Sequence, residues 1–227
     1  MKHIVVLTGA GISAESGIKT FRDADGLWEG HDVMEVATPE GFAANPELVL
    51  NFYNQRRAEL NTVKPNKAHL DLAELEKEFK VSIITQNVDD LHERAGSSNI
   101  THLHGELLKS RSSFDKTDIK TCTTDINIGD LCGKGYQMRP HIVWFGEDVP
   151  MLDKAIQICE TADILMIIGT SMQVYPAASL MHYVPQQTPT YFIDPKPNME
   201  SNKNITVIAE PATIGVTLVK NLLNSKA

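Results

Sequence analysis

The sequence predicts an α/β fold in which helices cover both faces of a parallel β-sheet. Apolar runs of strand length recur along the chain, and segments of helical or loop character separate them. Several of these runs lack the polar alternation of a half-exposed strand, which is typical of strands that are buried on both faces. Two stretches, residues 26–68 and 106–139, do not follow this repeating unit. We expect them to form a smaller lobe made of two insertions.

The apolar runs and the segments between them give the expected elements in order. Strands are expected at residues 3–8, 81–85, 100–103, 141–145, 164–168, 190–193 and 205–209. Helices are expected at residues 12–18, 46–61, 66–79, 152–161, 176–183 and 212–224. The larger lobe then takes residues 1–25, 69–105 and 140–227, and the whole chain, residues 1–227, forms a single domain of two lobes.

Composition excludes several classes of partner. With 227 residues, 42% of them hydrophobic, the chain can bury a large core. Its formal charge of −8 argues against a nucleic-acid surface, because such surfaces gather Lys and Arg, and the densest basic spot here is Arg56-Arg57. The first strand begins without a signal peptide, and no apolar run reaches membrane-spanning length. We expect a cytoplasmic monomer without nucleic-acid or membrane partners.

A glycine-rich turn follows the first expected strand. The apolar run at residues 4–8 leads into Gly9-Ala10-Gly11-Ile12-Ser13-Ala14-Glu15-Ser16-Gly17 and an expected helix. Glycine lets the backbone approach a ligand closely, and the free N–H groups at a helix start favour an anion. The pattern predicts a phosphate-binding loop. An ordinary strand-to-helix turn can show the same glycine spacing. The segments that follow are needed to distinguish such a turn from a phosphate-binding loop.

Those following segments differ from the ones in a dinucleotide-dependent dehydrogenase. Such an enzyme has, about twenty residues on, a strand that ends in an acid holding the adenosine ribose. Here residues 18–28 form a long polar loop, and the strand at residues 81–85 ends in Gln86-Asn87-Val88-Asp89-Asp90-Leu91-His92. Open parallel sheets bind ligands where the carboxyl ends of their strands meet. We expect a binding site at this edge, but not one for hydride transfer.

Six short motifs stand in order along the chain. They are Gly9-Ala10-Gly11-Ile12-Ser13, Gly17-Ile18 with Phe21-Arg22, Thr85-Gln86-Asn87-Val88-Asp89-Asp90-Leu91-His92, His104-Gly105-Glu106, Val143-Trp144-Phe145-Gly146-Glu147 and Gly169-Thr170-Ser171. Together they resemble the sirtuin family of NAD-dependent protein-lysine deacylases, and the resemblance covers nearly the whole chain. It implies a Rossmann-type large lobe, a small lobe, and a cleft between them that holds NAD and an acyl-lysine.

The resemblance gives the central catalytic role to His104. In the family, the acyl oxygen attacks the nicotinamide ribose and nicotinamide leaves. A histidine then acts as general base toward the ribose hydroxyls, which leads to free lysine and O-acyl-ADP-ribose. Imidazole suits this task because its ordinary pKa lies near physiological pH. A lone histidine is usually a packed or surface residue, but His104 matches the motif position. Asn87 matches a second catalytic position.

The resemblance also implies the residues that surround NAD. These are Gly9, Ala10, Gly11, Ile12, Ser13, Gly17, Phe21, Arg22, Trp28, Gln86, Asn87, Asp89, Gly169, Thr170, Ser171, Asp194 and Ala212. Asn87 and Asp89 offer the neutral and charged hydrogen bonds that a carboxamide and a ribose require, although capping of a strand end is the common role of such residues. Asp194 stands where relatives carry asparagine, so the chain departs from the family pattern there.

The helix expected at residues 46–61 carries a cation on its apolar face. Asn45 can cap this helix and Pro46 fits its first turn. The apolar face consists of Val49, Phe52, Tyr53 and Leu60, with Arg56 at the same spacing. No partner anion for Arg56 is evident nearby. Tyr53 lies one turn away, so the two side chains can bind one carboxylate; alternatively, Arg56 extends to water beside Arg57.

The resemblance favours the carboxylate site. Tyr53 and Arg56 match the Tyr-x-x-Arg pair of the sirtuin subgroup that removes succinyl, malonyl and glutaryl groups, and Ala37 matches a small residue that leaves room for a longer acyl chain. The peptide is expected to cross Val143, Phe145 and Gly146 as an added strand. We expect removal of succinyl or malonyl groups from protein lysines, with weaker deacetylation.

Two functions of other classes remain as alternatives. A protein ADP-ribosyltransferase would use NAD without an acyl-lysine, and the Tyr53/Arg56 pair disfavours it. A non-catalytic NAD-binding sensor would not need the general base, and His104 disfavours it.

The cysteine pattern predicts that no zinc is bound. Most sirtuins hold structural zinc with two Cys-x-x-Cys pairs, because tetrahedral coordination needs four ligands. Here the first pair is replaced by residues 109–113, Lys-Ser-Arg-Ser-Ser, and only Cys122 and Cys132 follow. No histidine lies between His104 and His141 to substitute. Cys159, beside Ile156 and Ile158, is expected to be a packed thiol.

Elemental analysis checks the zinc prediction. Purified protein is expected to contain far less than one equivalent of zinc, and a chelator is expected to leave its melting temperature unchanged, because two thiols cannot complete a tetrahedral site. An equimolar zinc signal would contradict the prediction.

Overall fold

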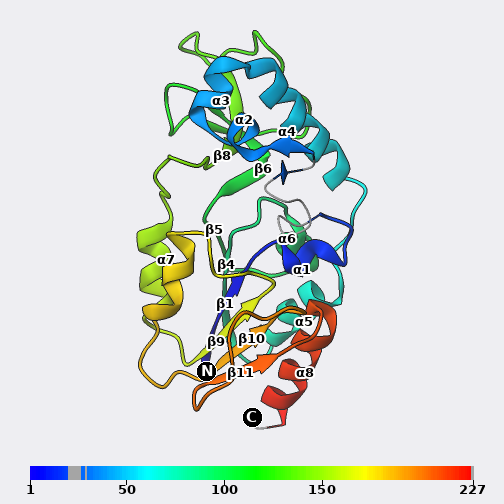
Figure 1. Ribbon diagram of the computed structural model, residues 1–227, viewed down its shortest axis with the longest axis vertical. Helices are drawn as coiled ribbons and strands as arrows, with labels where there is room; N and C mark the ends of the chain where they lie inside the picture. Colours follow the sequence, from blue (N-terminus) through cyan, green and yellow to red (C-terminus); the bar gives the residue numbers. More distant parts are fainter. Residues whose placement is uncertain (20–26, 29, 226–227) are drawn as a thin grey trace.

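A six-stranded parallel sheet forms the centre of the large lobe (Figure 1). The structure is a computed structural model that describes residues 1–19, 27–28 and 30–225. The strand order is β11-β10-β9-β1-β4-β5. Their bounds are β1 (His3–Thr8), β4 (Lys80–Thr85), β5 (Ile100–His102), β9 (Ile164–Ile168), β10 (Thr190–Ile193) and β11 (Ile205–Ile208). All six residues of β1 are buried, because this strand has a parallel neighbour on each side and apolar layers pack on both faces of the sheet.

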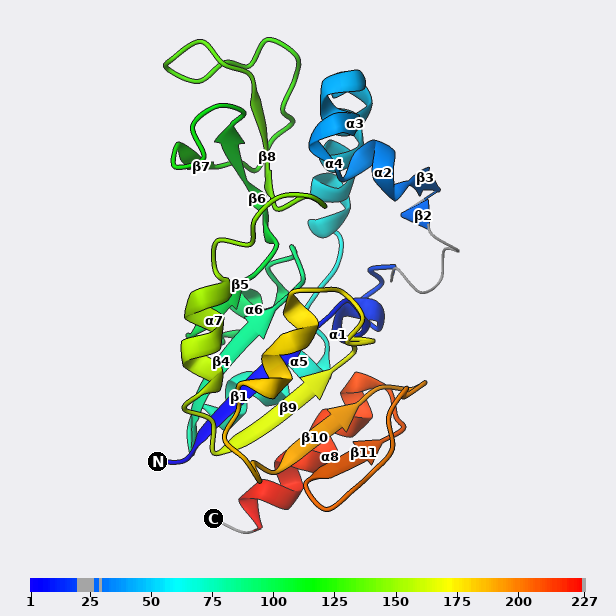
Figure 2. The same cartoon turned by 60° about the vertical axis from the view of Figure 1, so that its left-hand side comes forward.

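Helices cover the two faces of this sheet, as the sequence predicts (Figure 2). Alternate residues of β1 face opposite sides. Ile4 and Val6 pack with α5 (Lys67–Leu75) and α8 (Ala212–Asn224), whereas Val5 and Leu7 pack with α7 (Leu152–Cys159) and the 3₁₀ segment η2 (Ala177–His182). Cys159 is fully buried in the second layer, and burial raises the pKa of its thiol to about 12, which confirms a packed thiol. The predicted α/β fold class is therefore confirmed.

The small lobe contains helices and a three-stranded antiparallel sheet of order β7-β6-β8. The helices are α2 (Val33–Val36), α3 (Pro39–Ala44) and α4 (Pro46–Leu60), and the strands are β6 (Gly105–Ser112), β7 (Ile119–Thr121) and β8 (Met138–Ile142). A two-stranded ribbon, β2 (Leu27–Trp28) with β3 (His31–Asp32), precedes them. The Asn45 side chain accepts a hydrogen bond from the Leu48 N–H and Pro46 opens α4, as predicted. The face of α4 that contains Phe52 and Tyr53 packs on Leu107 and Ile142.

Several predicted elements are wrong in type or extent. The strand expected at residues 141–145 is β8, which ends at Ile142 and pairs with β6 in the small lobe, not in the parallel sheet. The first helix, α1 (Gly11–Ala14), is shorter than predicted because Gly17 adopts a φ of 100° soon after it. Residues 177–182 form a 3₁₀ helix, and α6 (Leu91–Ala95) was not predicted. Among the described residues, no helix is long and apolar enough to cross a membrane.

A small apolar cluster holds the end of the small lobe farthest from the parallel sheet. Leu50 of α4 packs there with Ile126, Cys132 and Met138. Asn54 binds the backbone of Ile126 twice, because its Nδ2 donates to the carbonyl at 3.0 Å and its Oδ1 accepts from the N–H at 3.0 Å. Asn54 thereby ties α4 to a loop 72 residues away.

Metal ligands do not assemble at this end of the lobe. Within residues 1–19, 27–28 and 30–225, no group of three or more His, Cys, Asp or Glu could hold a metal ion. The Cys132 thiol instead accepts a hydrogen bond from the Ser112 hydroxyl at 3.4 Å. The side chains present do not fit a structural zinc site, and the absence of zinc stays a prediction for elemental analysis.

Replacing Asn54 tests how the lobe is stabilised. We expect Asn54→Ala to lower the free energy of unfolding by about 1–3 kcal/mol, because the buried N–H and carbonyl of Ile126 lose their partner. Urea unfolding measures the change. Asn51→Ala, at an exposed position of the same helix, is the control and should change stability by less than about 0.5 kcal/mol. Equal stabilities of the two variants would contradict the role of Asn54.

Candidate functional site

Three loops meet at the carboxyl edge of the parallel sheet. They follow β1, β4 and β9, which are adjacent in the sheet. The Gly9 N–H donates to the Ile168 carbonyl at 3.0 Å, and the Gly11 N–H donates to the Gly169 carbonyl at 2.8 Å. Gln86 reaches across from the second loop, after β4, since its Nε2 donates to the Thr170 hydroxyl at 3.1 Å. The three predicted NAD-binding loops therefore lie together.

Glycine is required where the first and third loops touch. Gly169 has a φ of 62°, and a Cβ on it would lie 2.4 Å from the Ile12 backbone nitrogen. A Cβ on Gly11 would lie 2.6 Å from the Cα of Gly169. A larger residue at either position would push the backbones apart. The glycines thus bring α1 close to the end of β9, and no side chain caps the start of α1.

A buried polar chain connects two of these loops. The Asn87 amide donates to the Ser13 hydroxyl at 3.2 Å, and that hydroxyl donates to the Asp89 carboxylate at 3.0 Å. The other Asp89 oxygen accepts the Leu91 N–H at 3.1 Å. Burial raises the pKa of Asp89, and these hydrogen bonds oppose the shift. The chain offers amide, hydroxyl and carboxyl groups, which is the chemistry that a ribose and a carboxamide require.

His104 presents one ring nitrogen as a base. It lies between β5 and β6, and its Nδ1 is 3.1 Å from the Gln86 carbonyl oxygen. A carbonyl can only accept, so Nδ1 carries the proton and the neutral ring has its lone pair on Nε2. Burial lowers the pKa of His104, although the Gln86 hydrogen bond opposes this. The next residue must be glycine, because Gly105 has a φ of 82° and a Cβ there would lie 2.0 Å from the His141 carbonyl oxygen.

His102, two residues earlier, has a different environment. Its Nε2 lies 2.7 Å from a Glu93 carboxylate oxygen and its Nδ1 lies 3.1 Å from the Asn87 carbonyl. Burial lowers the pKa of His102, but Glu93 and the hydrogen bonds raise it more, so the net shift is upward. Both ring nitrogens are occupied, which leaves His104 as the better base of the two.

The segment after β8 connects His104 to the small lobe. The Val143 N–H donates to the His104 carbonyl at 2.9 Å, and the Phe145 N–H donates to the Ala37 carbonyl at 2.9 Å. Trp144 lies between them, and its indole N–H donates to the Tyr53 hydroxyl at 3.0 Å. The predicted residues Ala37, Tyr53, Val143 and Phe145 are therefore brought together beside His104.

A buried ion cluster holds this segment in place. The Glu147 carboxylate accepts hydrogen bonds from Arg139 at 2.9 and 3.2 Å, from Arg111 at 2.7 Å and from the Trp144 N–H at 2.9 Å. Burial acts to raise the pKa of Glu147, but Arg139, the Trp144 N–H and Arg111 lower it below its ordinary value. Arg139 also stacks on the Trp144 ring, with its guanidinium carbon 3.2 Å from the ring centroid. Sequence reasoning placed the motif here but missed both arginines.

The environment of Arg56 differs from the prediction. No nearby anion was expected, yet Arg56 forms a bidentate pair with Glu59, one turn along α4. Tyr53 is fully buried, and burial raises the pKa of its hydroxyl. Arg57 does not extend to water. It is 1% exposed and donates to the Leu107 carbonyl at 3.0 Å and to Asn54 at 2.8 Å.

The remaining predicted residues have varied positions. Asp194 is buried just after β10 and accepts the Lys196 N–H at 2.9 Å, and Ala212 is buried at the start of α8. Trp28 packs edge-on against Phe52, with ring centroids 4.9 Å apart. Phe21 and Arg22 lie outside the described residues. The contacts of all these residues with NAD stay predictions, as do those of Gly17, Ser171 and Gly146.

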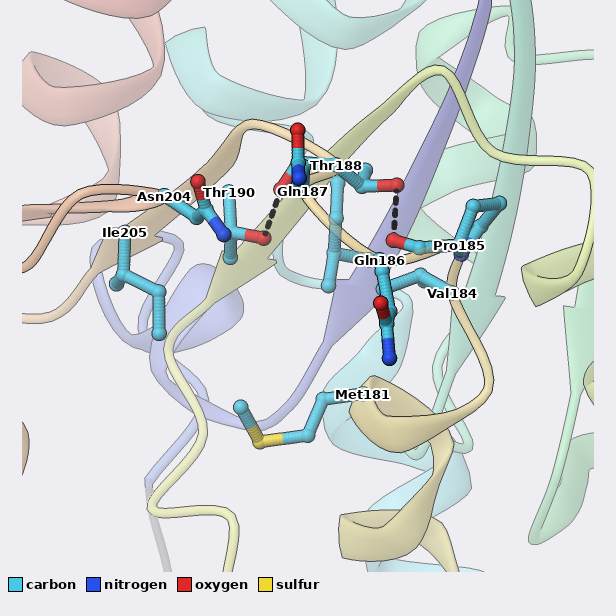
Figure 3. A pocket seen from close by; sticks show the side chains of 10 residues that line it. Met181, Val184, Pro185, Gln186, Gln187, Thr188, Thr190, Asn204 and Ile205 are labelled. Carbon is cyan, nitrogen blue, oxygen red and sulfur yellow. Dashed lines mark hydrogen bonds between the residues drawn. The ribbon is translucent and has the colours of Figure 1, made fainter.

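A separate pocket lies at the other end of the sheet (Figure 3). Its volume is about 370 Å³, and Thr190 and Ile205, two of its lining residues, are the first residues of β10 and β11. The described residues that line it also include Met181, Gln187 and Asn204, and none of them is charged. This pocket therefore belongs to the amino edge of the strands, away from His104 and the glycine loop.

Comparison with known families agrees with this geometry. The Sir2 family model matches residues 9–176, which span the glycine loop, His104, the ion cluster and the Gly169 loop. The chain belongs to the Sir2 family. The resemblance to sirtuins drawn from the six motifs is thus confirmed, and so is the Rossmann-type sheet.

Relatives of this Sir2 chain match over most of its length. A protein of Helicobacter pylori named NAD-dependent protein deacylase is 61% identical over 213 residues, which cover 93% of each chain. The solved structure of a Sir2 homologue in complex with NAD is 40% identical, with a TM-score of 0.88, and the match covers 100% of this chain and 91% of that one. A Sir2 structure with a deacetylated p53 peptide and 3′-O-acetyl-ADP-ribose is 28% identical, with a TM-score of 0.82 and coverage of 96% and 92%.

Proposed function

We propose that this Sir2 chain removes acyl groups from protein lysine side chains with NAD as co-substrate, and that it prefers acidic acyl groups such as succinyl and malonyl to acetyl. The observation that carries the reaction is the position of His104, whose free Nε2 lies beside both the NAD loops and the segment that holds Tyr53. The named function of the 61% identical relative supports the same reaction.

The residues at the sheet edge fit NAD. The glycine loop at the start of α1 would lie against the phosphate groups of NAD, because glycine lets the backbone approach a ligand closely. Asn87, Ser13 and Asp89 would bind the nicotinamide half, since they form one connected set of buried polar groups. NAD supplies the electrophilic ribose carbon when bound. The chain's own residues would orient that ribose.

His104 acts as the general base. Its Nδ1–H is fixed on the Gln86 carbonyl, so Nε2 takes a proton from a ribose hydroxyl without a change of tautomer. Burial lowers the pKa of His104 and keeps the ring neutral at physiological pH. A neutral ring is the form that a general base requires.

The peptide would enter along residues 143–147. This segment lies between the lobes, and its Phe145 is 46% exposed. The N–H groups of Val143 and Phe145 are already used within the chain, so an extended peptide would donate its own N–H groups to carbonyls of this segment, a main-chain pairing that accepts many sequences. The acyl chain would then point past Ala37 and Trp144 toward Tyr53 and Arg56.

The acidic-acyl preference depends on Arg56. Its guanidinium is a charge that can bind a planar carboxylate, and Tyr53 lies one turn away on α4. An acetyl group has no carboxylate and gains nothing from Arg56. Neither a protein ADP-ribosyltransferase nor an NAD sensor would need this arrangement beside His104, so both alternatives are less well supported than deacylation.

Replacing Arg56 tests the preference. We expect Arg56→Met to reduce kcat/KM for a succinyl-lysine peptide about tenfold to a hundredfold, because a charge-assisted hydrogen bond is lost, and to change the acetyl-lysine value less than about twofold. Nicotinamide release with matched peptides measures both. Lys64→Met, an exposed change of equal charge just after α4, should leave both values unchanged. Equal losses with both peptides would contradict the role of Arg56.

The pH profile tests the base. His104 is active when neutral, so kcat/KM should stay constant above pH 6.5 and fall only as the pH drops through its lowered pKa. His104→Ala should lose about a hundredfold to ten-thousandfold in rate, whereas His182→Ala, at an exposed position, should keep the whole profile. An acid limb above pH 6.5 would contradict this assignment.

A further inference from the structure

Glu59 occupies one edge of the Arg56 guanidinium. Arg56 Nε donates to Glu59 Oε2 at 2.9 Å, and Nη2 donates to Oε1 at 2.7 Å. The Arg56 side chain is only 13% exposed, whereas that of Glu59 is 58% exposed. The guanidinium also lies over the Phe52 ring, 5.1 Å from its centroid. Arg56 is therefore largely covered by protein, and its carboxylate partner reaches it from the solvent side.

We propose that Glu59 moderates the acyl specificity of the enzyme by partly neutralising Arg56, which limits the preference for acidic acyl groups and lets uncharged ones enter. This proposal rests on the proposed function, because it concerns how Arg56 receives the acyl chain. The Nη1 end of Arg56 remains available to the substrate carboxylate while Glu59 holds the Nε edge.

The physical reason is the free-energy cost of removing a charged group from water. A guanidinium without a counter-ion is costly to desolvate, so an acetyl chain that displaced water from Arg56 would leave an unpaired cation. Glu59 supplies the counter-ion and removes this penalty for acetyl. For a succinyl chain, Glu59 has the opposite effect, because it is a second carboxylate on the same cation and like charges repel.

Glu59 should change the binding of acetyl and succinyl chains only moderately. Glu59 is more than half exposed, so water and salt weaken its field, and pairs of this kind are worth little in stability. The residue therefore adjusts a preference and does not create one. The direction of the adjustment differs between charged and uncharged acyl groups, which is what makes it testable.

The test compares Glu59→Gln with wild-type enzyme on succinyl-lysine and acetyl-lysine peptides of the same sequence. Gln keeps the size and one acceptor oxygen but removes the charge. We expect KM for the succinyl peptide to fall about twofold to fivefold at unchanged kcat, and KM for the acetyl peptide to stay the same or rise. Glu47→Gln, the same charge change at an exposed position in the first turn of α4, should alter neither KM.

Further measurements separate a failure of the Glu59 proposal from a failure of the proposed function. Glu59→Ala, which also removes the charge, should shift the two KM values in the same directions, and calorimetric binding of the succinyl peptide should show the same gain. If Glu59→Gln leaves the succinyl KM unchanged or raises it while Arg56→Met is still selective, Glu59 does not limit the preference, and the proposal is wrong although the function stands. An equal fall for both peptides would also overturn it. If Arg56→Met affects both peptides equally, the acidic-acyl preference in the proposed function fails, and deacylation itself stands.

Discussion

The Glu147 carboxylate is the point on which the arrangement of the two lobes depends. It accepts hydrogen bonds from Arg111 of β6, from Arg139 of β8 and from the backbone of Trp144. Because the charge is mostly covered by protein, it is stable only while these donors surround it, and they in turn fix the path of residues 142–147. Along that path, the Val143 N–H donates to the His104 carbonyl and the Phe145 N–H donates to the Ala37 carbonyl. One buried acid thus places the proposed peptide-binding segment against both lobes.

The parallel sheet supplies the other half of the site in a different way. Adjacent strands β4, β1 and β9 end at one edge, so Gln86, the glycine loop and Gly169 meet there. Glycine at positions 11 and 169 lets the backbones touch, and the buried Asn87, Ser13 and Asp89 follow from that closeness. The parallel sheet carries the residues proposed to bind NAD, whereas the small lobe carries those proposed to bind the acyl chain. His104 lies where they join.

The sequence predicts the first half better than the second. Continuous apolar strands and the polar residues after them are local patterns, so the parallel sheet and its edge could be located from periodicity. The contacts of Glu147 cannot be read this way, since Arg111 is 36 residues away and lies on a strand whose pairing is interrupted by a bulge. The burial of Arg57 could not be read either, because it depends on the Leu107 carbonyl, 50 residues away. The Arg56–Glu59 pair was readable, since residues three apart on a helix are neighbours. The expectation that no anion lies near Arg56 was therefore wrong.

The small lobe is built from segments that lie far apart in the sequence and are therefore synthesised at different times. Tyr53 finds its partner Trp144 only 91 residues later, and Asn54 must wait 72 residues for Ile126. Until then the apolar face of α4, with Phe52 and Tyr53, has no sheet to cover it. Contacts of such long sequence separation form slowly and leave apolar surface open to aggregation. A nascent chain of this protein therefore exposes the apolar face of α4 until the segment that contains Trp144 has been synthesised.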